Sequence, residues 1–147
     1  GQNYGAKNYD RIAKTYKIVL SNILILGGII TIIFVFFPRP LYGMFFKDEK
    51  MIALGISYLS IVGFSQLFMC AEITTSGAFN GMGKTLQPTV ISIIFTSLRI
   101  PIALILIPLL GLNGIWWSIS LTSIAKGILV VILFLIVLKK IDVKETK

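Results

Sequence analysis

The sequence contains no histidine and a single cysteine, Cys70, among its 147 residues. Without histidine, the common zinc sites, the Ser-His-Asp triad and a histidine proton shuttle are excluded. A lone cysteine can form neither an internal disulfide nor a CxxC metal site. The apolar segments also lack the paired acids from which a general acid and base are built. We therefore expect a protein that is not an enzyme and that carries neither a metal nor a cofactor.

Charged residues are scarce as well, at 14% of the chain against 56% hydrophobic residues. A soluble globular domain carries roughly a quarter charged residues, so this class is excluded. The net charge of +8 does not indicate a nucleic-acid partner. Its lysines and arginines stand between long apolar runs and form no basic stripe.

Long apolar runs are what the sequence has in abundance. About 20 apolar residues are needed for a helix to cross a hydrocarbon core of roughly 30 Å. Four runs approach or exceed that length, over residues 18–37, 51–83, 88–107 and 115–138. Since backbone exposed to lipid must satisfy its own hydrogen bonds, all four should be helices. The sequence predicts an all-α bundle of four antiparallel transmembrane helices with the lipid bilayer as its surroundings.

The basic residues outside these spans are distributed unequally between the two sides of the membrane. Nine would lie on the side of the termini and three on the other side, and cytoplasmic segments carry the excess. The sequence therefore predicts a multi-pass protein with both termini in the cytoplasm. The nine are Lys7, Arg11, Lys14, Lys17, Lys84, Lys139, Lys140, Lys144 and Lys147, and the three are Arg39, Lys47 and Lys50.

Three ionisable residues, Glu72, Arg99 and Lys126, interrupt the second, third and fourth spans. Each is about 13 residues from the nearest cytoplasmic end, which is about 20 Å along a helix. The three charges should therefore share one depth. A charge near the membrane centre costs roughly 2.5 to 3.5 kcal/mol on insertion scales, so we expect all three to face protein or water. Ionisable residues in such positions are typical of ion and substrate pathways through a membrane. We therefore predict that the three residues bind the coupling ion or the substrate of a transport process.

Small polar residues recur at helical spacing around these charges. Two serines flank Glu72 at i−7 and i+4, a threonine lies at i−3 from Arg99, and Thr122 and Ser123 stand one turn before Lys126. Such polar faces fit a wet cavity or a buried network. A methionine beside Glu72 adapts to varied ligands. The predicted cavity-lining residues are Ser65, Met69, Ser76 and Thr96.

Two interpretations of the charged layer remain open. In one, Glu72 and Arg99 form an interhelical ion pair that sets the register of the helices. In the other, Glu72 binds a proton or a cation during transport. The two can hold together. Lys126 is either a direct ligand or a side chain that extends along its stem toward a polar pocket.

Glycine and proline positions give further expectations about packing. The spacing of Gly77 and Gly81 and the pair Gly27 and Gly28 predict close helix contacts. Pro101 predicts a kink in the third span, because proline removes a helical hydrogen bond.

Four local patterns, in this order, resemble the multidrug and toxic compound extrusion family of secondary transporters. They are GQNYGAKN at residues 1–8, GAFNGMGKT at 77–85 with Pro88 after it, RIP at 99–101 and GLNGIWW at 111–117. Each pattern alone is a weak signal. Together they span nearly the whole chain, on the predicted topology.

The resemblance implies a twelve-helix antiporter of two lobes in the plasma (inner) membrane. It would export organic, often cationic, drugs in exchange for sodium ions or protons. Residues 1–147 would be part of the C-terminal lobe and would hold the last four helices. The first lobe and two further helices would belong to the rest of the transporter chain. Family members carry a buried acid on the helix that here holds Glu72, although its register differs among subgroups.

Two other functions remain open. A flippase for lipids or lipid-linked oligosaccharides, from the same superfamily, would use buried Arg99 and Lys126 to hold phosphates. A small four-helix scaffold subunit would use the charges for helix docking only.

Overall fold

The computed structural model describes residues 1–145, and side chains as far as residue 141. Every regular element in this part of the chain is a helix, so the predicted all-α fold is confirmed. The elements are α1 (Gln2–Gly5), α2 (Tyr9–Phe36), α3 (Pro38–Gly43), α4 (Glu49–Gly81), α5 (Leu86–Leu110) and α6 (Leu112–Glu145). Among the described helices, α2, α4, α5 and α6 are long and apolar enough to cross a membrane.

The ends of the long helices are marked by capping residues and proline. The Asn8 side chain accepts a hydrogen bond from the Arg11 backbone N–H (3.2 Å) at the start of α2. Asp48 accepts one from Lys50 (2.9 Å) at the start of α4. These side chains satisfy N–H groups that have no partner within the first turn. Pro38 is the first residue of α3, directly after α2 has ended, where its missing N–H costs no helical hydrogen bond.

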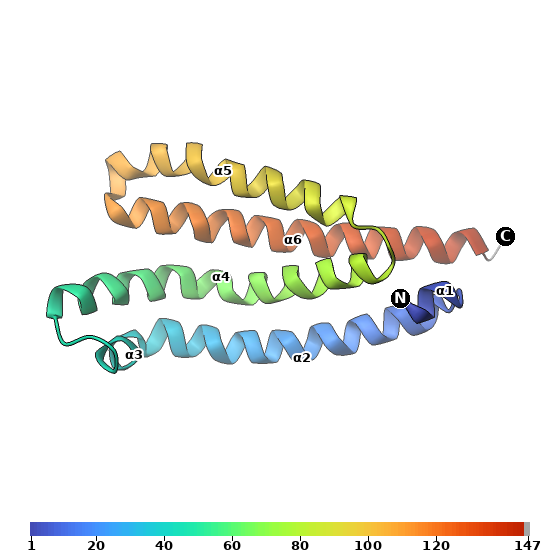
Figure 1. The fold of residues 1–147 in the computed structure, drawn as a ribbon, viewed down its shortest axis with the longest axis horizontal. Coiled ribbons are helices and arrows are strands. Elements are labelled where there is room, and N and C mark those ends of the chain that lie inside the picture. The colour runs from blue at the N-terminus through green and yellow to red at the C-terminus, as the bar shows by residue number, and fades with distance from the viewer. Residues whose placement is uncertain (146–147) are drawn as a thin grey trace.

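The four long helices lie side by side in the order α5, α6, α4, α2 (Figure 1). Helix α6 packs along both α4 and α5, whereas α4 and α5 scarcely touch although they are consecutive in the chain. These two consecutive helices are therefore not packed against each other. Helix α6 returns between them.

The connection between α5 and α6 explains this order. It consists of Gly111 alone, at φ +58°, a conformation that glycine adopts without steric cost. A Cβ atom added to Gly114 would lie 2.6 Å from the carbonyl oxygen of Leu106, so the first turn of α6 rests on the backbone of α5. Helix α5 also runs through Pro108, where the sequence predicted a longer loop, and it does so with one helical hydrogen bond fewer, since proline has no N–H.

The start of the chain, the C-terminal end of α6 and the α4–α5 connection lie at one end of the bundle (Figure 1). We call this the terminal end, and the opposite end, with α3 and Gly111, the loop end. This arrangement agrees with the prediction that both termini share one side. Lys147 lies outside the described residues, and the side chain of Lys144 is not described.

A cluster of buried side chains joins three helices at the terminal end. It comprises Tyr16 of α2, Phe79 of α4, Met82 directly after α4, and Phe134 of α6. The ring centroid of Phe134 lies 4.3 Å from that of Tyr16 and 5.0 Å from that of Phe79. Rings at such separations attract beyond their buried area. The Tyr16 hydroxyl is 2.8 Å from Thr75 Oγ1, so this buried polar group has a hydrogen-bond partner.

The glycines show where helices approach most closely. A Cβ on Gly127 of α6 would lie 2.5 Å from the Phe68 carbonyl oxygen of α4, and one on Gly27 would lie 3.2 Å from Cys70 Sγ. The predicted close contact at Gly27 is confirmed. At Gly28 and Gly77 it is wrong, because no described atom lies within 4 Å of an added Cβ. Gly77 faces a cavity.

Candidate functional site

The largely buried carboxylate of Glu72 is paired with an ammonium from the neighbouring helix. Lys126 Nζ of α6 lies 3.2 Å from Glu72 Oε2 of α4, and the two side chains are 10% and 15% exposed. One residue further along, Gly127 touches the backbone of α4 at Phe68, one turn before Glu72. The absence of a side chain at Gly127 therefore brings the two helices close enough for the pair to form.

Arg99 is held by hydroxyl groups of α6 and not by the carboxylate. Its Nε donates to Thr122 Oγ1 (3.1 Å) and its Nη2 to Ser123 Oγ (3.0 Å). The predicted ion pair between Glu72 and Arg99 is wrong. The pair does not form because α6 lies between α4 and α5 and places Lys126 next to Glu72.

The contacts agree with the prediction that Glu72, Arg99 and Lys126 lie at a similar depth. Thr122 and Ser123, which hold Arg99, precede Lys126 by three or four residues. That separation is about 4.5 to 6 Å along a helix. The three charged groups therefore lie within about one helical turn of one another. Lys126 is the cation paired with the Glu72 carboxylate, whereas Arg99 donates to neutral hydroxyl oxygens.

Helix α6 carries a buried polar seam that sequence reasoning recovered only in part. Its members are each at most 3% exposed, and they are Ser118, Ser120, Thr122 and Ser123. The Ser120 hydroxyl donates to the Ile61 carbonyl of α4 (3.1 Å), and that of Thr122 donates to the Ser118 carbonyl (2.7 Å). Ser118 and Ser120 were missed. The signal was the run of small polar residues in an apolar span, which indicates a helix with neighbours on two sides.

The four predicted cavity-lining residues have different surroundings. Ser65 is fully buried, and its hydroxyl donates to the Val62 carbonyl (2.8 Å) and lies 3.9 Å from Met69 Sδ. Met69 and Ser76 are half-buried, and Thr96 on α5 is exposed. None of the four lines the cavity described next, so their role stays a prediction.

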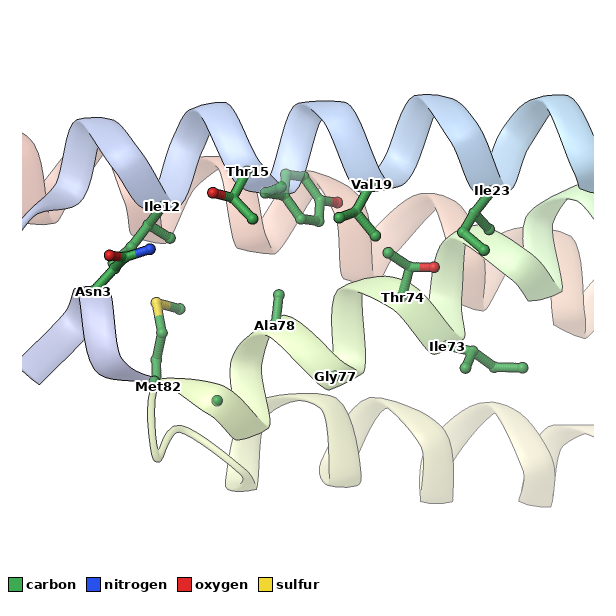
Figure 2. Close-up of a pocket in the computed structure, with 13 residues that line it drawn as sticks. Asn3, Ile12, Thr15, Val19, Ile23, Ile73, Thr74, Gly77, Ala78 and Met82 are labelled. Carbon is green, nitrogen blue, oxygen red and sulfur yellow. The ribbon is translucent and has the colours of Figure 1, made fainter.

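A cavity of about 400 Å³ lies between α1, α2 and α4 toward the terminal end (Figure 2). Figure 2 shows Thr15 and Val19 of α2 on one side of it, with Thr74 and Ala78 of α4 on the other. Helix α4 thus presents Glu72 to α6 and Thr74 to the cavity. An apolar wall with a few hydroxyls is typical of sites for small organic molecules. The lining residues are Gly1, Asn3, Ile12, Thr15, Tyr16, Val19, Ile23, Ile73, Thr74, Gly77, Ala78, Gly81 and Met82.

Four long apolar helices with a paired charge buried between two of them define a multi-pass membrane protein. Comparison with known families gives a more specific result. A family model described as MatE matches residues 1–105. Because that match covers most of the chain, the protein belongs to the MatE family, and the resemblance of its sequence patterns to this family is confirmed.

Two relatives have names that indicate drug resistance. The chain is 33% identical over 107 residues to the Probable multidrug resistance protein NorM of Thermotoga maritima. The aligned region covers 71% of this chain and 23% of that protein. It is 25% identical over 118 residues to the Probable multidrug resistance protein YoeA of Bacillus subtilis, covering 78% of this chain and 26% of that protein. The chain spans about a quarter of the length of these relatives.

Proposed function

We propose that this chain forms part of a secondary active antiporter, and not of an enzyme. The antiporter exports organic, often cationic, drugs or toxins in exchange for sodium ions or protons. The observation that carries this proposal is the Glu72 carboxylate, buried within a membrane helix and balanced by a side chain on another helix. Ionisable groups in such positions are expensive and are typical of ion and substrate pathways. The family and the names of its two relatives support the same function.

In the proposed mechanism, the coupling ion and the cationic substrate share Glu72. A proton or sodium ion that neutralises the carboxylate weakens its attraction for the substrate, so the two ligands exclude each other. Exchange then requires that each ligand has different affinities for two conformations of the bundle. In this mechanism, the packing of the helices around Glu72 differs between the two conformations.

The proposal includes a membrane orientation and partners. Both termini lie in the cytoplasm and the protein resides in the plasma (inner) membrane. Support comes from the basic side chains at the terminal end, which outnumber those at the loop end in the described part of the chain. The first lobe and two further helices of the transporter complete the substrate path. The basic side chains at the terminal end are Lys7, Arg11, Lys14, Lys17, Lys84, Lys139 and Lys140.

Substitution of Glu72 in the full-length protein tests the proposal. Glu72→Gln should abolish export of a fluorescent organic cation while membrane insertion is preserved, because glutamine keeps the shape and an oxygen acceptor but removes the charge. Export is measured in everted vesicles. Glu49→Gln is the matched control, since Glu49 lies on the same helix and is 76% exposed. Retained export with normal coupling in Glu72→Gln would eliminate Glu72 from the mechanism.

The excess of cations in the charged layer favours one second candidate, a flippase for phosphate-bearing lipids. Arg99 and Lys126 would then hold the phosphate. Transport of a labelled lipid phosphate that is lost in Arg99→Gln, with no transport of the organic cation, would support the flippase. A scaffold role would be indicated by transport of neither substrate.

A further inference from the structure

We propose that Lys126 is the resident counter-ion of Glu72. It occupies the carboxylate when no other cation is bound, and every cation that binds Glu72 must displace it. The inference rests on the proposed function and adds to it the group that sets the affinity of the site. Lys126 therefore sets the affinity of the site for cations and is not itself a ligand of the substrate.

The contacts of Lys126, which is buried, and of Arg99, which is half-buried, support different roles. Two hydrogen bonds, from Nε and Nη2, hold the planar guanidinium of Arg99 against α6. Lys126 approaches Glu72 with a single ammonium group, 3.2 Å from the carboxylate, at the end of a flexible four-carbon stem. Arg99 is therefore a fixed charge, whereas Lys126 can exchange its place at the carboxylate with another cation.

The geometry makes such an exchange a competition. Two cations near one carboxylate repel each other, and this repulsion is strong where little water is present. Both partners of the pair are at most 15% exposed, so water screens them poorly. A second cation cannot share Glu72 with the ammonium at low cost, and the ammonium has to withdraw.

Withdrawal of Lys126 affects the packing of the helices. The nearest hydroxyls along α6 toward the loop end belong to Thr122 and Ser123, and both already hold Arg99. A displaced ammonium that moves toward them approaches another positive charge. Cation binding at Glu72 thus disfavours the packing of α4, α6 and α5 seen here relative to one in which these helices are rearranged. This links occupation of the site to conformation.

Equilibrium binding of tetraphenylphosphonium, a permanent organic monocation, to the purified full-length protein tests the inference. Loss of the competing charge in Lys126→Met should tighten binding about tenfold or more, since loss of a charge-assisted hydrogen bond exceeds the 1.4 kcal/mol that corresponds to a factor of ten. Lys126→Arg keeps a competing cation and should bind like the wild type. Lys140→Met, an exposed position on the same helix, should leave the affinity unchanged.

Two further measurements cover the case in which Lys126→Met does not fold. Lys126→Gln removes the charge but keeps a hydrogen-bond donor, and it should tighten binding in the same direction. In the wild type, saturation with tetraphenylphosphonium should increase the reaction of Lys126 with an amine-directed reagent, measured by mass spectrometry. Lys140 provides the internal reference. Unchanged affinity in both variants, or unchanged reactivity of Lys126, would overturn the inference.

Glu72→Gln separates this inference from the proposed function. If both the proposed function and the counter-ion inference are right, Lys126→Met binds more tightly. Binding is then lost in Glu72→Gln, whether alone or combined with Lys126→Met. Loss of binding in Glu72→Gln without any effect of Lys126→Met refutes only the counter-ion. Binding that survives Glu72→Gln refutes the role of Glu72 in the proposed mechanism, and the counter-ion with it.

Discussion

At the scale of single residues, the three charges in the bundle differ in what they would lose on mutation. Glu72 and Lys126 each neutralise the other, so removing one leaves a buried charge without a partner. Breaking such a pair costs more than the pair itself contributes to stability. Arg99 depends on neutral hydroxyls and would be affected by changes in α6.

A double-mutant cycle tests the energy of this pair. Glu72→Ala and Lys126→Ala should each lower the free energy of unfolding in detergent by about 3 to 5 kcal/mol, and the double variant by much less than the sum. Arg39 and Glu49 form the control cycle, because that pair is 3.5 Å apart and more than 70% exposed. Its coupling should be at most about 1 kcal/mol. Additive losses at Glu72 and Lys126 would show that they do not interact.

At the scale of elements, α6 organises the bundle. It is fixed to α5 by Gly111 and Gly114 and to α4 by Gly127, and its hydroxyls bond to both neighbours. In the most apolar stretch of each helix, 33% of the residues of α6 and 28% of those of α4 are buried, compared with 6% in α2 and in α5. The inner helices are therefore the two that carry the ion pair.

Substitution of glycine by alanine tests the contact between α4 and α6. Gly127→Ala should lower the melting temperature in detergent, since its Cβ would meet the Phe68 carbonyl oxygen at 2.5 Å and overpacking typically costs about 1 to 3 kcal/mol. Gly28→Ala is the control. Open space surrounds that position, and the higher helix propensity of alanine should leave stability equal or slightly raised. Equal effects at the two positions would contradict the close approach.

At the scale of the whole molecule, the charges outside the membrane spans give the bundle a direction. Basic side chains concentrate at the terminal end, where α2 begins and α4 is connected to α5 (Figure 1). Positive segments remain in the cytoplasm during insertion. The distribution of charge therefore predicts which end faces the cytoplasm.

Cysteine labelling in intact cells checks this orientation. In a background with Cys70→Ser, a membrane-impermeant maleimide should label Lys47→Cys from outside. Lys84→Cys should react only after the cells are permeabilised. Both positions lie outside the long helices, Lys47 at the loop end and Lys84 at the terminal end. The reverse pattern would invert the proposed topology.

Prediction from the sequence succeeded for features that depend on counting along the chain. The four spans and the common depth of the charges follow from the length of apolar runs and from the rise of a helix. The partners of Glu72 and Arg99 did not follow, because the order in which the helices pack is not fixed by their order in the sequence. The small polar residues beside the charges were recognised from the sequence. Thr122 and Ser123, however, accept hydrogen bonds from Arg99, not from Lys126.

The sequence alone determined that the chain has four apolar helices long enough to cross a membrane, and it predicted termini on one side and three charges at one level. A bilayer imposes a span length, a requirement for internal hydrogen bonds and a preference for basic residues on one side, and all three are properties of composition and spacing. Only the tertiary structure decided that α6 lies between α4 and α5 and that Lys126 faces Glu72. Helices that are apolar on nearly all sides can be arranged side by side in several orders, and close backbone contacts at glycines select among them.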